Sequence, residues 1–104
     1  MSEDAKTRKY TRTNVDKKIP IHLDGFGDSD LVSLGFGGLY VTSASPLPVG
    51  TVVHLSLPLP DQEPPINVTA KVVYMHEGKG MGIEFIDLSV RDAERIGVFI
   101  LLNN

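Results

Sequence analysis

Apolar and polar residues alternate with a period of two in several short segments of the chain. The clearest segment is 66–76, where every second position is occupied by Ile66, Val68, Ala70, Val72 and Tyr74. Because successive side chains of a β-strand point to opposite faces, this pattern predicts a half-buried strand that has these five residues on one face.

Shorter segments repeat the pattern and predict further strands at 19–23, 38–43, 51–57 and 81–85. The residues expected to share a face within them are Leu39 with Val41, Val53 with Leu55 and Leu57, and Met81 with Ile83 and Phe85. Composition predicts turns at Gly25–Asp28 and Gly78–Gly80. The prolines between 58 and 65 indicate a loop, because proline cannot donate to a sheet.

The pattern changes to a helical period at the end of the chain. Ser89 to Asp92 resembles a capping box, in which the Ser89 hydroxyl accepts from the Asp92 amide and the Asp92 carboxylate bonds back. The residues that then share one helical face are Val90, Ala93, Ile96, Phe99 and Ile100. We therefore predict a C-terminal helix over about 89–102, in which Gly97 costs about 1 kcal/mol relative to alanine. Short strands followed by one amphipathic helix predict a mainly β fold, a small antiparallel barrel with a helix across its side or mouth.

The first 18 residues contain few apolar side chains and show no period. We expect a flexible basic N-terminal arm over 1–18 and a folded domain over 19–104. The arm holds six of the ten basic residues and carries a net charge of +3, in a chain whose net charge is −3. This contrast predicts that the arm meets an anion, whereas the body repels nucleic-acid backbones.

Composition limits the fold and its chemistry. A chain of 104 residues fits one domain, and its 41% apolar and 22% charged residues are close to the globular average. There is no cysteine, so disulfides, thiolate metal sites and thiol nucleophiles are excluded. The N-terminus lacks the apolar run of a secretion signal, and no segment reaches the roughly 18 apolar residues of a membrane span. We therefore expect a cytoplasmic protein without membrane insertion.

The residue types that carry catalysis show no productive grouping. Ser33 lacks the leading glycine of a nucleophile elbow, and the three histidines (His22, His54 and His76) fall on separate predicted strands or strand ends without ligand spacing. The glycines at 25–27 and 35–38 match neither G-x-G-x-x-G nor the phosphate-loop pattern. We therefore predict a protein that is not an enzyme and that has no resident cofactor or metal.

Two arginines in the arm have a specific chemical use. Arg8 and Arg12 are four residues apart, and each guanidinium fork can bind a phosphate or the O6/N7 edge of guanine through two parallel hydrogen bonds. A basic arm alone is also typical of a solvated segment that binds anions without specificity.

The order of the motifs resembles the PilZ family of bacterial cyclic di-GMP receptors, over nearly the whole chain from Arg8 to the terminal helix. In that family an R-x-x-x-R arm precedes a D/N-x-S-x-x-G motif, a six-stranded barrel and a C-terminal helix. Arg8 and Arg12 match the first motif, Gly37–Val41 resembles the continuation of the second, and Gly80–Ser89 resembles the closing strand and the entry into the helix. The resemblance implies a small six-stranded antiparallel β-barrel with a C-terminal α-helix.

The second motif is altered in this chain. In a gap-free alignment on Gly37–Leu39, Ser33 replaces the acidic or amide residue and Gly35 replaces the serine. Placing Ser33 on the family's serine instead puts Leu31 at the acidic position and requires an inserted residue. Either register loses side chains that the family uses to read guanine, and each such buried hydrogen bond costs about 1 to 3 kcal/mol. Backbone donors near Gly35 and Gly38 can compensate.

The residues that the resemblance assigns to a cyclic di-GMP site are Arg8, Arg12, Ser33, Gly35 and Gly38. One hypothesis is a non-enzymatic regulatory module in cyclic di-GMP signalling, in control of motility or surface polysaccharide, which acts mainly through a protein partner and has weakened or lost nucleotide binding. The alternative is a functional receptor in which the two arginines clamp the dinucleotide.

A third hypothesis from a different class is a barrel whose basic arm binds RNA or single-stranded DNA. The net charge of −3 and the scattered aromatic residues disfavour it, because single-strand binding uses a positive groove lined by stacking aromatics. No DNA or RNA partner is therefore expected.

Overall fold

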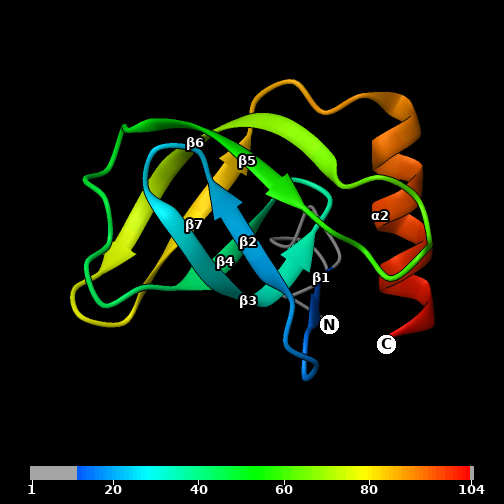
Figure 1. The fold of residues 1–104 in the computed structure, drawn as a ribbon, viewed down its shortest axis with the longest axis horizontal. Coiled ribbons are helices and arrows are strands. Elements are labelled where there is room, and N and C mark those ends of the chain that lie inside the picture. Colours follow the sequence, from blue (N-terminus) through cyan, green and yellow to red (C-terminus); the bar gives the residue numbers. More distant parts are fainter. Residues whose placement is uncertain (1–11, 104) are drawn as a thin grey trace, which may run out of the picture.

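The computed structural model of the protein describes residues 12–103, which form seven strands and one helix (Figure 1). The elements in chain order are β1 (Arg12–Asn14), β2 (Pro20–Leu23), β3 (Gly27–Gly35), β4 (Gly38–Thr42), β5 (Val52–Leu57), β6 (Ile66–His76), β7 (Gly80–Phe85) and α2 (Val90–Leu102). Six strands close into an antiparallel barrel in the order β2, β3, β4, β7, β6, β5, because β5 pairs back onto β2. The predicted six-stranded barrel with a C-terminal helix is confirmed, and β1 is an additional strand beside β3.

The barrel interior is filled by the alternate residues that the sequence pattern predicted. The inward residues of β5 and β6, each at most 6% exposed, are Val53, Leu55, Leu57, Ile66, Val68, Ala70 and Val72. Leu39 and Val41 of β4 and Met81 and Ile83 of β7 complete the opposite wall. Full burial of one such branched or long side chain contributes about 1.5 to 3 kcal/mol, so this alternation is what holds the barrel closed.

Strand β3 was not predicted, because its pattern is irregular. It begins with the polar run Asp28–Asp30 and contains a β-bulge, where Leu31 pairs with Val41 but Ser33 already pairs with Tyr40. The extra residue on β3 reverses its alternation, so that Leu31 and Leu34 are both buried in the core. A strict period of two cannot detect a strand whose inward residues are three apart.

A second bulge lies in β6 and changes the position of a predicted core residue. Val72 pairs with Ile83, whereas Tyr74 pairs with Gly82, so β6 has one residue more than β7 between these pairs. Tyr74 was expected on the same face as Val72, and the structure shows instead that it is 42% exposed on the outside of the barrel. The bulge is the physical reason, since one inserted residue exchanges the two faces of a strand.

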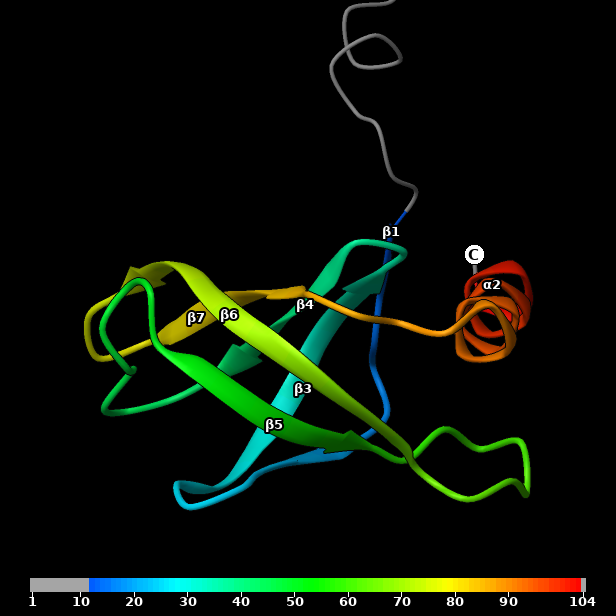
Figure 2. The same cartoon turned by 90° about the horizontal axis from the view of Figure 1, so that it is seen from above.

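The helix lies at one end of the barrel (Figure 2) and begins as predicted. Ser89 is its N-cap and accepts a hydrogen bond of 3.1 Å from the Asp92 amide. The buried residues of α2 are Ile96, Phe99 and Ile100, whereas Val90, which was expected on the same face, is 77% exposed in the first turn. No helix in the part of the chain that the structure describes is long and apolar enough to cross a membrane.

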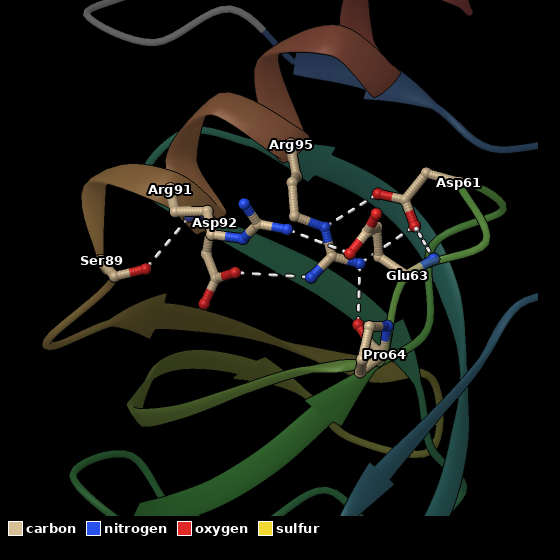
Figure 3. Close-up of polar contacts among 7 residues, drawn as sticks. All are labelled: Asp61, Glu63, Pro64, Ser89, Arg91, Asp92 and Arg95. Carbon is tan, nitrogen blue, oxygen red and sulfur yellow. Dashed lines mark hydrogen bonds and ion pairs between the residues drawn. The ribbon is translucent and has the colours of Figure 1, made fainter.

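A polar clamp joins α2 to the loop between β5 and β6 (Figure 3). Arg95 donates to both carboxylate oxygens of Asp61, at 2.8 and 3.0 Å, and to the carbonyl oxygen of Pro64 at 2.8 Å. The carboxylate of Asp92, predicted to bond back to Ser89, accepts from Arg95 at 3.4 Å. With its side chain only 12% exposed, Arg95 fixes the helix against the loop.

The beginning of the described chain differs from the expected arm. Arg12–Asn14 form β1, which pairs with the end of β3, and Thr13 between them is buried. The hydroxyl of Thr13 donates to the carbonyl oxygen of Asn103 at 3.0 Å, so the strand is also tied to the end of α2. These three residues have a regular structure because β3 extends beyond its pairing with β2 and offers β1 a free edge.

Candidate functional site

A cavity of about 600 Å³ lies beside β1, the β3–β4 hairpin and the neighbouring ends of β6 and β7. Its polar lining comes from Arg12, Asn14, Tyr74 and Glu84, and its glycine lining comes from Gly35, Gly37, Gly38 and Gly82. The volume is within the range of small-molecule sites, about 300 to 1,000 Å³. The residues that line it come from positions between 12 and 84 of the sequence, so the closed barrel is what brings them together.

Strand β1 aims two polar residues at this cavity. Arg12 pairs with Gly35 and Asn14 pairs with Ser33, while Thr13 between them turns inward. Because side chains of a strand alternate, burial of Thr13 leaves Arg12 and Asn14 together on the exposed face. Arg12 therefore lines the cavity, and its guanidinium fork can donate two parallel hydrogen bonds to an anion or to a guanine edge.

Close packing explains two of the cavity glycines, Gly38 and Gly82. A side chain at Gly38 would overlap the carbonyl oxygen of Ile83, because β4 and β7 pass very close to each other at this point. A side chain at Gly82 of β7 would overlap the ring of Tyr74, which extends from the neighbouring strand β6 over this glycine. The cavity therefore has a floor of bare backbone, which a ligand can approach closely.

Tyr74 belongs to an aromatic cluster on the outside of the barrel. Its ring stacks on Tyr40, with centroids 6.0 Å apart and an interplanar angle of 24°, and lies 5.5 Å from the ring of His76. The Tyr40 hydroxyl and the Nδ1 atom of His76 are 2.8 Å apart, within hydrogen-bond distance. This contact fixes Tyr40 and His76 relative to each other. The half-exposed ring of Tyr74 packs against both and forms one side of the cavity.

The structure places three of the five predicted site residues in this cavity. Arg12, Gly35 and Gly38 line it. Ser33 is 9% exposed within β3 and is not among the lining residues, and Arg8 lies outside residues 12–103. In the hairpin Leu34 pairs with Leu39, so Gly35 and Gly38 flank a very short connection that presents backbone and no polar side chain.

Sequence reasoning missed three cavity residues with polar side chains, namely Asn14, Tyr74 and Glu84. Asn14 is two positions after Arg12, so a strand interpretation of this segment would have found it. Tyr74 was assigned to the core because the bulge in β6 leaves no signal in the alternation. Glu84 alternates correctly with Ile83 and Phe85, but no sequence motif marks it as part of a site.

The charges in the cavity are opposed. Arg12 supplies a cation on β1 and Glu84 an anion on β7, where it pairs in register with Gly38 on one side and Lys71 on the other. Within residues 12–103 there is no group of three or more histidine, aspartate or glutamate side chains that can hold a metal ion. The arrangement is thus suited to binding a ligand that carries both phosphate and hydrogen-bond donors.

Solved structures with the same fold include PilZ domains. The PilZ domain with c-di-GMP of YcgR from Escherichia coli superimposes with a TM-score of 0.75 at 15% identity, over 92% of this chain and 90% of that chain. The inhibitor of motility MotI/DgrA from Bacillus subtilis gives 0.70 at 18% identity, over 91% of this chain and 49% of that one. The PlzA protein of Borreliella burgdorferi in complex with c-di-GMP gives 0.62 at 18% identity, over 93% and 44%.

The chain thus spans about half the length of the Bacillus and Borreliella proteins. No curated protein sequence matches it. A sequence model of one family, the PilZ domain, matches residues 6–102. This match covers nearly the whole chain and agrees with the barrel, the extra strand and the terminal helix, and the chain therefore belongs to the PilZ domain family.

Proposed function

We propose that this chain is a non-catalytic regulatory module of cyclic di-GMP signalling, which binds the dinucleotide weakly in the cavity beside Arg12 and acts through a protein partner. The observation that carries the proposal is the meeting of Arg12 with Gly35 and Gly38 in one cavity of about 600 Å³. Arg12 is far from the two glycines in the sequence. Membership of the PilZ family supports assigning all three residues to one nucleotide site.

The proposed affinity is weak because the second motif offers few side chains. Ser33 is buried in β3 and Gly35 has no side chain, so neither supplies a hydrogen bond to a base in the cavity. Two missing hydrogen bonds at about 1 to 3 kcal/mol each lower the affinity by about 30-fold or more. Arg8, which precedes the described residues, is proposed to add a second guanidinium fork.

Calorimetric titration of the pure protein with cyclic di-GMP tests this function. Binding is expected to be measurable in the wild type and to fall by about 10- to 100-fold in Arg12→Ala, because a charge-assisted bidentate contact is worth about 1.5 to 3 kcal/mol. Arg91→Ala is the matched control, since Arg91 is an exposed arginine of α2 and does not line the cavity. Absence of binding up to about 1 mM, equivalent to about −4 kcal/mol, would reject a nucleotide-binding function.

A second candidate is an adaptor that has lost nucleotide binding altogether. It is favoured by the surface of α2, where Val98, Leu101 and Leu102 are 55%, 77% and 77% exposed. Exposed apolar side chains grouped at one end of a helix are typical of a surface that binds another protein. The same titration separates the candidates. An adaptor that does not bind the nucleotide gives no binding heat with cyclic di-GMP, either as the wild type or as the Arg12→Ala variant.

A further inference from the structure

Glu84 lies in the candidate site and has no role in the function described so far. We propose that it is a specificity-determining residue, whose carboxylate accepts hydrogen bonds from the N1–H and N2–H groups of a guanine base in the cavity. The inference rests on the proposed function, since it requires a cyclic dinucleotide to bind beside Arg12.

The position of Glu84 follows from the alternation of β7. Met81 and Ile83 turn into the core, so Gly80, Gly82 and Glu84 share the outer face. Rings of Tyr40 and Tyr74 lie over the two glycines, and Glu84 is exposed at the end of this row. A base that enters the cavity beside the Tyr74 ring therefore meets the carboxylate of Glu84 at its edge.

The neighbours of Glu84 leave its carboxylate accessible from the cavity. Its partner on β4 is Gly38, which has no side chain, and its partner on β6 is Lys71. No cation among residues 12–103 lies within ion-pair distance of Glu84. A carboxylate in this position is available for hydrogen bonds to a ligand.

The four polar side chains of the cavity differ in their capacity to donate and accept hydrogen bonds. Arg12 only donates, Asn14 and Tyr74 both donate and accept, and the carboxylate of Glu84 only accepts. Guanine presents two adjacent donors at N1 and N2, which the two oxygens of a carboxylate match, whereas the guanidinium of Arg12 matches a phosphate. Glu84 is the lining side chain whose two oxygens match two adjacent donors.

The same carboxylate determines what the cavity rejects. Phosphate groups are repelled by Glu84 and attracted by Arg12, so the dinucleotide is oriented with a base towards β7 and a phosphate towards β1. Adenine presents a lone pair at N1 in place of the N1–H donor. An adenine in this position would set that lone pair against the carboxylate and leave one carboxylate oxygen without a donor, which selects against cyclic di-AMP.

Titration of four proteins with two ligands tests this inference. Cyclic di-GMP and cyclic di-AMP are each titrated into the wild type, Glu84→Gln, Glu84→Ala and the control Glu77→Gln, which removes an exposed charge from the β6–β7 turn. The wild type is expected to prefer cyclic di-GMP by about tenfold or more, and both Glu84 variants to lose about tenfold of that preference. Cyclic di-AMP is expected to bind the Glu84 variants as well as or better than the wild type, because a repulsive charge has been removed.

The outcomes separate this inference from the proposed function. If the wild type binds cyclic di-GMP and Glu84→Gln keeps its preference, or weakens both ligands equally, the role of Glu84 is rejected while the proposed function stands. If the wild type binds neither ligand, the proposed function itself fails. Unfolding midpoints of all four proteins are expected to agree, since both glutamates are exposed, so that any change in binding reports recognition and not folding.

Discussion

At the scale of single residues, Gly38 lies at a point where β4 and β7 leave no room for a side chain. A β-carbon at this position would overlap the carbonyl oxygen of Ile83 and would also meet the α-carbon of Glu84. Backbone atoms on a paired strand cannot rotate away as a side chain can. The sequence assigned Gly38 to a ligand site through a family motif, and the structure shows in addition a packing reason for glycine at this position.

We therefore expect Gly38→Ala to destabilise the fold by about 1 to 3 kcal/mol, because the new methyl group must push β7 away from β4. Chemical denaturation monitored by circular dichroism measures the change. An unfolding free energy equal to that of the wild type would contradict the close approach of the two strands.

At the scale of secondary-structure elements, two bulges decide which residues face the core. The bulge in β3 buries Leu34 together with Leu31, and the bulge in β6 moves Tyr74 outward to the cavity. Regular strands such as β5 were predicted correctly, since their inward residues alternate without interruption. A bulge is set by the number of residues on the partner strand, which is a property of the pair and not of either segment alone.

A glycine-to-alanine substitution in the helix is expected to change the unfolding free energy in the opposite direction from Gly38→Ala. Gly97 is in the interior of α2, where a β-carbon would lie 3.2 Å from the ring of Phe36, which is 40% exposed and able to move slightly. Gly97→Ala is therefore expected to stabilise the protein by about 0.5 to 1 kcal/mol through helix propensity. The same denaturation measurement applies, and a loss of stability would show that Phe36 cannot yield.

At the scale of the whole molecule, the clamp on Arg95 holds the helix to the barrel. The guanidinium of Arg95 lowers the pKa of the Asp61 carboxyl below its ordinary value of 3.8, mainly through their hydrogen bonds. The unfolded chain thus binds a proton at Asp61 more readily than the folded protein does. The stabilising contribution is fully present above pH 3.8 and is lost as the pH falls through the lower pKa of the folded state.

This sign gives a pH-dependent prediction. At neutral pH, Asp61→Asn is expected to lower the unfolding free energy by about 1 to 2 kcal/mol, and the difference from the wild type is expected to shrink as the pH falls below 3.8. Glu63→Gln is the control, because the pair of Glu63 with Arg91 is exposed and worth about 0 to 1 kcal/mol. Equal effects of the two substitutions at every pH would contradict the clamp.

The sequence by itself determined the parts of the protein that local rules encode. Uninterrupted alternation identified the strands at 51–57 and 81–85, Ser89 identified the start of the helix, and ordered motifs identified the PilZ family. In the candidate site, Arg12 and the glycines of the hairpin could be predicted because they belong to these motifs.

The tertiary structure alone decided the strand β1, the irregular strand β3 and the polar lining of the cavity. Asn14, Tyr74 and Glu84 come from β1, β6 and β7, and they meet only once the barrel is closed. Strand register and bulges depend on pairing between segments that are far apart in the chain. Arg12, visible in the sequence as half of a motif, thus acquires its neighbours, and with them the chemistry of a binding site, from the fold.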